Sequence, residues 1–173
     1  MLKVTECELE GLKIIEPQVF ADDRGWFMEL YRKEDYEEAG ICCEFVQDNR
    51  AYSKQGVLRG MHFQVKYPQD KLLSVLRGEI YDVAVDIRKD SKTYGKWFGI
   101  RLSDENKKQV FIPKGFAHGY LVLSKEAEIL YKCSEIYHPE DEGGIAWDDP
   151  KLAIQWPISV QSELIISEKD RNW

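Results

Sequence analysis

Cysteine is scarce in this sequence, and its four copies form no recognisable pattern. Cys42 and Cys43 are adjacent, Cys7 and Cys133 stand far from them, and no CxxC pair occurs. Such spacing is typical neither of a disulfide framework nor of a zinc site. We therefore expect reduced thiols and a cytoplasmic location.

Long apolar runs and a surplus of positive charge are also missing. No stretch approaches the length of a membrane span, and the first 15 residues lack the basic and apolar segments of a secretory signal. The formal net charge is −7. A general nucleic-acid binder is therefore not expected, because no broad basic surface is available to neutralise phosphates. An anionic ligand would have to be bound by a local group of Arg and Lys.

Linkers, low-complexity tracts and internal repeats are absent as well. The chain has 173 residues, of which 43% are hydrophobic, so it is long enough to bury a substantial core. We expect one domain over residues 1–173.

Short alternating segments separated by turn signals dominate what is present. The clearest is Ile80 to Ile87, where Val83 and Val85 share one face and polar residues the other. The best helix candidate is Lys33 to Ala39, which Gly40 ends. Many short strands with little helix predict an antiparallel sandwich or small barrel. Further strands are expected at 26–31, 45–50, 57–64, 71–76, 97–102, 109–112, 119–123 and 128–133, with an extended segment at 12–20 and a tail at 147–157 that wraps the barrel.

Two segments combine glycines with histidine. They read Gly56-x5-His62-x-Gln64, followed by Lys71-x6-Gly78, and Pro113-x-Gly115-x2-His118. Both resemble motifs of the cupin superfamily, whose metal-binding members supply three His and one Glu to a metal ion. Here Gln64 and Lys71 occupy two ligand positions, and a Lys cation repels a metal ion. The motifs therefore predict an all-β, cupin-type jelly roll with one or two short helices, without a metal or cofactor.

A metal-free interior that holds His, Lys and Tyr suits proton transfer next to a carbonyl group. Beyond the two motifs, matching blocks run in order from about Ile15 onward. They are Asp23-Arg24-Gly25, Gln47-Asp48-Asn49, 57–64, 82–86, 112–119, Tyr131-Lys132 and 167–170. Together they make the sequence similar to the dTDP-4-dehydrorhamnose 3,5-epimerase family over nearly its whole length.

The resemblance implies a catalytic set for epimerising a dTDP-linked 4-keto-6-deoxyhexose at C3 and C5, whose protons the C4 ketone acidifies. His62 would be the base, and Asp170 would orient its ring and support the imidazolium. Tyr131 would return a proton from the opposite face. Lys71 would stabilise the enolate oxygen.

The resemblance also implies a binding set for the nucleotide sugar. Tyr137 would stack near the thymine. Family members are homodimers that exchange N-terminal strands, so Arg24 and Glu29 are expected to serve the partner's site. The other expected contacts are Gln47, Asp48, Asn49, Arg59, Gln64, His118, Glu142 and Lys169.

Several of these residues also have ordinary structural explanations. Ser167-x-x-Asp170 matches a helix capping box, but three residues after Asp170 leave almost no helix to cap, which favours the pairing with His62. Tyr131 could pack in the core, and Lys71 could extend from a barrel mouth. The family match favours the functional explanation.

Other functions stay open from the sequence. A mono-epimerase or a 3,4-ketoisomerase would use the same fold and base. A metal-dependent cupin oxygenase is disfavoured by Gln64 and Lys71. A non-catalytic sugar-nucleotide-binding cupin is disfavoured because a binder needs no base opposite an acid.

Overall fold

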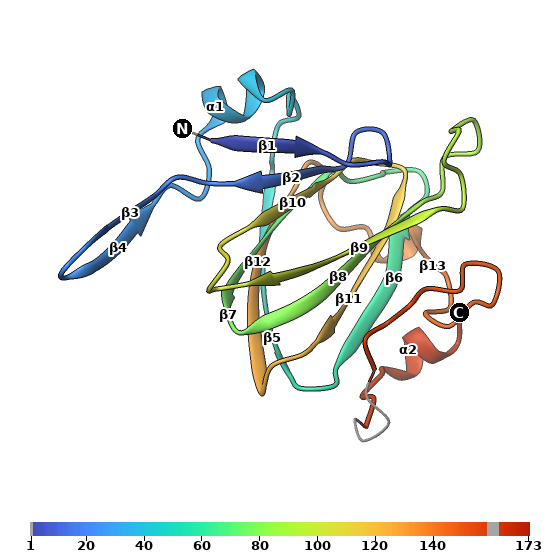
Figure 1. Ribbon diagram of the computed structural model, residues 1–173. Helices are drawn as coiled ribbons and strands as arrows, with labels where there is room; N and C mark the ends of the chain where they lie inside the picture. The colour runs from blue at the N-terminus through green and yellow to red at the C-terminus, as the bar shows by residue number, and fades with distance from the viewer. Residues whose placement is uncertain (1, 159–162) are drawn as a thin grey trace.

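Two antiparallel sheets form the body of the molecule (Figure 1). The computed structural model describes residues 2–158 and 163–173. In spatial order, the first sheet contains β1 (Lys3–Glu6), β2 (Lys13–Glu16), β10 (Gln109–Ile112), β7 (Lys71–Arg77), β12 (Glu126–Cys133) and β5 (Gln47–Lys54). The second contains β13 (Glu142–Gly144), β6 (Leu58–Gln64), β11 (Phe116–Val122), β8 (Glu79–Asp86) and β9 (Trp97–Ser103).

The chain passes repeatedly from one sheet to the other. β5 leads to β6, β7 to β8, β9 to β10, and β11 to β12, and each of these steps changes sheet. The remaining elements are a separate hairpin of β3 (Val19–Asp22) and β4 (Gly25–Met28), the helices α1 (Lys33–Glu38) and α2 (Glu168–Arg171), and a 3₁₀ turn at Pro139–Asp141. The predicted all-β architecture with short helices is confirmed.

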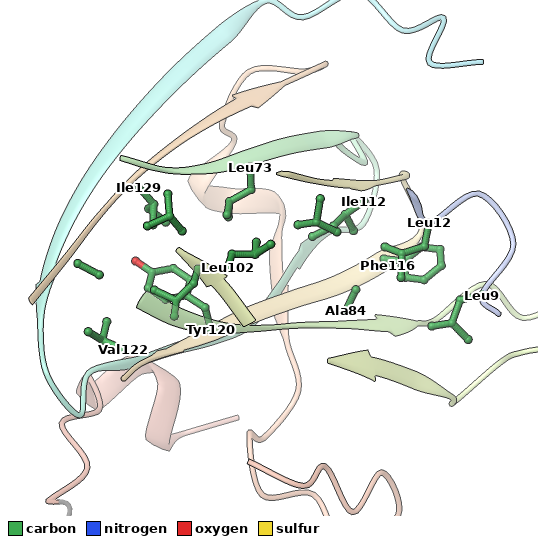
Figure 2. Close-up of a cluster of buried hydrophobic side chains, with 14 residues drawn as sticks. Leu9, Leu12, Leu73, Ala84, Leu102, Ile112, Phe116, Tyr120, Val122 and Ile129 are labelled. Carbon is green, nitrogen blue, oxygen red and sulfur yellow. The ribbon is translucent and has the colours of Figure 1, made fainter. Parts of the chain in front are cut away.

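The core lies between the two sheets (Figure 2). Leu73 and Ile129 come from the first sheet and meet Leu102 and Val122 from the second. Leu12, from the loop between β1 and β2, joins the same cluster. Removing these side chains from water is the main force that holds the sheets face to face.

The segment after β13 covers the outer face of the second sheet. Leu152 and Trp156 pack against Met61, Val83 and Val85. The indole N–H of Trp97 donates to the Leu152 carbonyl oxygen at 3.0 Å. The wrapping tail predicted at 147–157 therefore covers residues that would otherwise leave an apolar sheet face in water.

Several elements differ from the sequence-based prediction. The extended segment at 12–20 is broken into β2 and β3, and β1 and β13 were not predicted. β1 carries the mostly polar sequence KVTE and forms a strand through its pairing with β2, in which Val4 lies opposite Ile15. Because such a strand depends on its neighbour and not on its own alternation, local sequence does not reveal it.

Candidate active site

A cavity of about 310 Å³ lies between the sheets. Its walls come from β5, β7 and β12 on one side and from β6 and β11 on the other. Predicted site residues make up most of the lining: His62, Lys71, Tyr131, Gln47, Asn49, Arg59, Gln64, His118, Tyr137 and Glu142.

His62 and Asp170 form a close pair at the wall of this cavity. Asp170 Oδ1 lies 2.7 Å from His62 Nε2, and Asp170 is 4% exposed. The Gly60 backbone N–H donates to the other carboxylate oxygen at 3.3 Å. An ionised carboxylate only accepts hydrogen bonds, so Nε2 carries the proton in this pair. The basic lone pair of a neutral His62 is then on Nδ1, which lies 3.9 Å from Glu142 Oε1.

A β-bulge turns Arg59 and His62 toward the same side. In the pairing of β11 with β6, His118 lies opposite His62, but Tyr120 lies opposite Arg59, so β6 has one extra residue. A bulge of this kind shifts the two-residue alternation of a strand. Arg59, three residues from His62, therefore also lines the cavity, where its Nε donates to Ser53 Oγ at 3.1 Å.

Ser167 and Asp170 form only the serine half of the capping box, and the Asp170 side chain pairs with His62, as the sequence reasoning favoured. Ser167 caps α2 by accepting from the backbone N–H of Asp170 at 3.1 Å. The Asp170 side chain is left free to reach His62. In a full capping box the side chain of this residue would reach back to the backbone N–H of Ser167, but here the Asp170 carboxylate contacts His62 and the Gly60 N–H instead.

Tyr131 enters the cavity from the sheet opposite His62. It lies on β12, where it is paired with Asn49 of β5, while His62 lies on β6 of the second sheet. Burial raises the pKa of Tyr131 to about 12, with smaller effects from Cys133 and Tyr120. Its hydroxyl is therefore protonated at neutral pH and is able to donate.

Lys71 adds a second cation, beside Arg59, to the cavity lining. Burial lowers the pKa of its ammonium group, while Cys133, Asp82 and Glu142 act in the opposite direction. Lys71 lines the cavity, so its ammonium group is available to a ligand there. His118 lies nearby in the lining and is held by Asp82, whose Oδ2 is 2.7 Å from His118 Nε2.

Glu142 connects the cavity to its rim. It accepts from Tyr137 Oη at 2.5 Å and forms an ion pair with Lys169. Burial opposes ionisation of Glu142, but the hydrogen bonds from Lys169 and Tyr137 prevail and lower its pKa. Lys169 thus meets the site through Glu142 and not through the lining itself.

Three predicted contacts lie away from the cavity of this chain. Arg24 is on the β3–β4 hairpin, where it pairs with Asp22, and its side chain is 90% exposed. Glu29 follows that hairpin and is exposed. Asp48 points outward from β5 and pairs with Lys132.

Sequence reasoning also missed parts of the lining, namely Ala51, Phe63, Gln69, Gly119 and Tyr120. Tyr120 could have been found, because it lies two residues after His118 on β11 and strand residues two apart share a face. Gln69 lies in an irregular loop, where no such rule applies.

Among residues 2–158 and 163–173, no three His, Cys, Asp or Glu side chains gather closely enough to hold a metal ion. No helix in the same ranges is long and apolar enough to cross a membrane.

Comparison with known proteins connects this geometry to a family. The family model described as dTDP-4-dehydrorhamnose 3,5-epimerase matches residues 6–173. The chain belongs to this family. The resemblance inferred from the motif blocks is confirmed.

Curated and solved members of the epimerase family match along almost the whole chain. The dTDP-4-dehydrorhamnose 3,5-epimerase of Methanothermobacter thermautotrophicus is 58% identical over 168 residues, covering 97% of this chain and 91% of the relative. A crystal structure of dTDP-6-deoxy-D-glucose-3,5-epimerase from Legionella pneumophila Philadelphia 1, in complex with dTDP-4-keto-L-rhamnose, superposes with a TM-score of 0.96. Its identity is 50%, and the match covers 99% of this chain and 91% of that one. The predicted cupin-type jelly roll is thereby confirmed.

A less similar solved structure has a narrower activity. It is a 3′-monoepimerase from Streptomyces bikiniensis in complex with dTDP-quinovose, with 33% identity and a TM-score of 0.88. The match covers 96% of this chain and 84% of that one. The fold is therefore shared by relatives with double and with single epimerase activity.

Proposed function

We propose that this protein epimerises a dTDP-4-keto-6-deoxyhexose at C3 and C5, giving dTDP-4-dehydro-L-rhamnose. The observation that carries the proposal is the arrangement of two proton-transfer groups on facing sheets. His62, backed by Asp170, lines one wall of the cavity, and Tyr131 lines the other. Inversion of a carbon needs a base on one face of the sugar and a proton donor on the other.

The first step removes a proton next to the ketone. His62 Nδ1 accepts the proton from C3 or C5, and the C–H electron pair moves into an enolate whose negative charge is on O4. The imidazolium is stabilised by Asp170, 2.7 Å from Nε2. Lys71 supplies positive charge for the enolate oxygen within the cavity.

The second step returns a proton from the other side. The Tyr131 hydroxyl donates to the carbon as the enolate collapses to the ketone, and the carbon is inverted. His62 then releases its proton and Tyr131 regains one from solvent, which resets both groups. The same cycle at the second carbon completes the double epimerisation.

Binding of the nucleotide portion is assigned to the rim of the cavity. Arg59 offers a guanidinium for the diphosphate, since arginine recognises phosphate oxygens in a bidentate manner. Tyr137 is 48% exposed and offers a ring face for the thymine. The other polar groups available to the sugar nucleotide are Gln47, Asn49, Gln64, His118, Glu142 and Lys169.

We also propose a homodimer in which the β3–β4 hairpin reaches the partner's site. The hairpin extends away from the two sheets (Figure 1). It exposes Phe20, Trp26 and Phe27 to 54%, 58% and 64%, an apolar surface that a partner would cover. Arg24 and Glu29, which lie outside the cavity of their own chain, would then be delivered to the other one. Asp48 lies on the outer face of β5, outside the cavity of its own chain. It would contact a ligand only if the dimer brings it near a site.

A cytoplasmic location is part of the same proposal. The four cysteines are all free, as expected in a reducing compartment.

The experiment that tests the proposed activity is an incubation with dTDP-4-keto-6-deoxyglucose in heavy water. NMR and mass spectrometry should find deuterium at both C3 and C5, and a coupled reductase should then yield dTDP-L-rhamnose. His62→Ala should abolish exchange while dTDP binding stays measurable. Deuterium at one carbon alone would identify a mono-epimerase. No exchange would refute the proposal and favour a ketoisomerase or a binding protein.

A further inference from the structure

The segment that carries Asp170 is short and depends on its neighbours. α2 contains four residues, Glu168–Arg171, which is about one turn. An isolated helix of this length is not stable in water, because nucleation outweighs the few hydrogen bonds formed. Besides its bond from the Gly60 N–H, the position of the Asp170 carboxylate therefore depends on the contacts that hold the segment at either end.

At the upstream end, the backbone is attached to the second sheet. Ile165 N–H donates to the Gly56 carbonyl oxygen at 2.9 Å, and Leu58 N–H donates to the Ile165 carbonyl oxygen at 3.0 Å. These bonds fix residue 165, five positions before Asp170. They do not determine how the chain continues toward His62.

At the downstream end, the contact is made by an aromatic ring. The indole of Trp173 lies directly on the backbone of Gly144 in β13, so closely that a methyl group at Gly144 would overlap ring atoms of Trp173. Gly144 is in turn the residue paired with His62 across β13 and β6. The ring therefore packs beside the strand that carries the base, three residues after Asp170.

A second contact with β13, made by Lys169 within α2, is a weaker anchor for the segment. Lys169 forms an ion pair with Glu142, and its side chain is 50% exposed, so solvent screens the pair. Both residues also belong to the proposed binding set, and contact with substrate would replace their mutual bond. The Trp173–Gly144 contact uses neither group, so contact of substrate with Lys169 or Glu142 would not replace it.

We propose that Trp173 is a positioning residue for the His62–Asp170 pair. By packing on Gly144 it holds residues 167–173 against β13, which keeps the Asp170 carboxylate on His62 Nε2. The inference rests on the proposed function, because its kinetic effect is expressed through the base. It assigns to Trp173 no contact with substrate.

The test compares Trp173→Ala with Trp173→Phe in the heavy-water assay. Trp173→Ala should lower turnover about tenfold while dTDP affinity changes less than about threefold, and Trp173→Phe should regain most of the loss. Tyr94→Ala is the matched control, since Tyr94 is a 58%-exposed aromatic in the β8–β9 connection and should leave turnover unchanged.

A double-mutant cycle separates positioning from a general structural effect. If Trp173 acts through Asp170, then Trp173→Ala should change turnover less than about twofold in an Asp170→Asn background. An equal loss in both backgrounds, or wild-type turnover for Trp173→Ala, would overturn the inference. No exchange by the wild-type protein would instead refute the proposed function, so the two failures are distinguishable.

A spectroscopic measurement covers the case in which turnover is lost through misfolding. The imidazole N–H protons of His62 and His118, each bonded to a carboxylate at 2.7 Å, can be followed by proton NMR. Trp173→Ala should weaken or shift the His62 signal and leave the His118 signal in place. Retention of both signals would contradict the inference. If both vanish, the same comparison is made with Trp173→Phe and with Gly144→Ala, which disturbs the contact from its other side and should shift only the His62 signal.

Discussion

Lys71 illustrates how one residue can oppose stability while supporting catalysis. Burial lowers the pKa of its ammonium group, so the folded protein holds the charge less favourably than the unfolded chain does. We predict that Lys71→Met lowers turnover roughly 100-fold, the usual effect of losing one group that stabilises an oxyanion. The same change should raise Tm by about 2–4 °C, because an apolar side chain avoids burying a charge.

The thermal effect of Lys71→Met should depend on pH in a defined direction. Below the lowered pKa, Lys71 is charged in both states and the full penalty of burial is present. As pH rises from that pKa toward the ordinary Lys value, the folded protein loses the proton first, so wild-type stability from this group increases. The Tm advantage of the variant should therefore shrink at alkaline pH in scanning calorimetry. Lys89→Met, at an exposed position, is the control and should show no such trend. A Tm advantage of Lys71→Met that grows with pH would contradict a lowered pKa for Lys71.

Tyr131 allows proton removal and inversion to be measured separately. Because burial raises its pKa to about 12, the hydroxyl holds a proton through the neutral range. Tyr131→Phe keeps the ring and deletes the donor, so inversion should fall about 100-fold while His62 still exchanges the substrate proton. NMR in heavy water reports deuterium uptake and configuration in one experiment. Equal losses of exchange and inversion would show that Tyr131 is not the donor.

At the scale of the strand, the bulge in β6 determines which side chains meet. Gly60 has φ of 120°, and a Cβ there would lie 2.5 Å from the Gly119 Cα and 2.7 Å from the His118 carbonyl oxygen. We predict that Gly60→Ala lowers the free energy of unfolding by more than about 2 kcal/mol, since backbone strain and a clash with β11 add. Chemical denaturation followed by fluorescence measures the change.

Gly95 supplies the control for Gly60. Its φ of 75° is also positive, but nothing lies within 4 Å of an added Cβ. Gly95→Ala should therefore lower the free energy of unfolding by about 1 kcal/mol, from backbone strain alone. Similar losses for Gly95→Ala and Gly60→Ala would mean that the approach of Gly119 is unimportant.

The same strands show what the sequence can and cannot reveal. Alternation over Ile80 to Ile87 predicted β8 nearly to its ends, because both faces of that strand follow a simple two-residue rule. On β5 the rule sends Gln47 and Asn49 inward and Asp48 outward, whereas matching the three as one block did not separate them. The bulge that brings Arg59 beside His62 depends on pairing with β11 and has no local signal.

Contacts between segments far apart in the sequence are visible only in the complete fold. β13 is three residues long and exists through its pairing with β6, and α2 reaches His62 across 108 residues of chain. The family resemblance anticipated the pairing of His62 with Asp170. The contact between Trp173 and Gly144 corresponds to no motif in the sequence and required the three-dimensional structure.

At the scale of the whole molecule, the β3–β4 hairpin decides whether one chain makes a complete site. If Arg24 acts in the partner's cavity, a dimer of one His62→Ala chain and one Arg24→Ala chain contains one site with both residues intact. Mixing and re-associating the two poorly active variants should then restore about a quarter of wild-type turnover, because half of the dimers are mixed and each has one working site. A mixture of His62→Ala with Tyr131→Phe is the control. In that mixed dimer, one subunit lacks the base and the other lacks the proton donor. Because His62 and Tyr131 line the same cavity of one chain, neither site is intact. Failure of the Arg24→Ala mixture to regain turnover, despite mixed dimers seen by native mass spectrometry, would place Arg24 outside the partner's site and remove the hairpin exchange from the proposal.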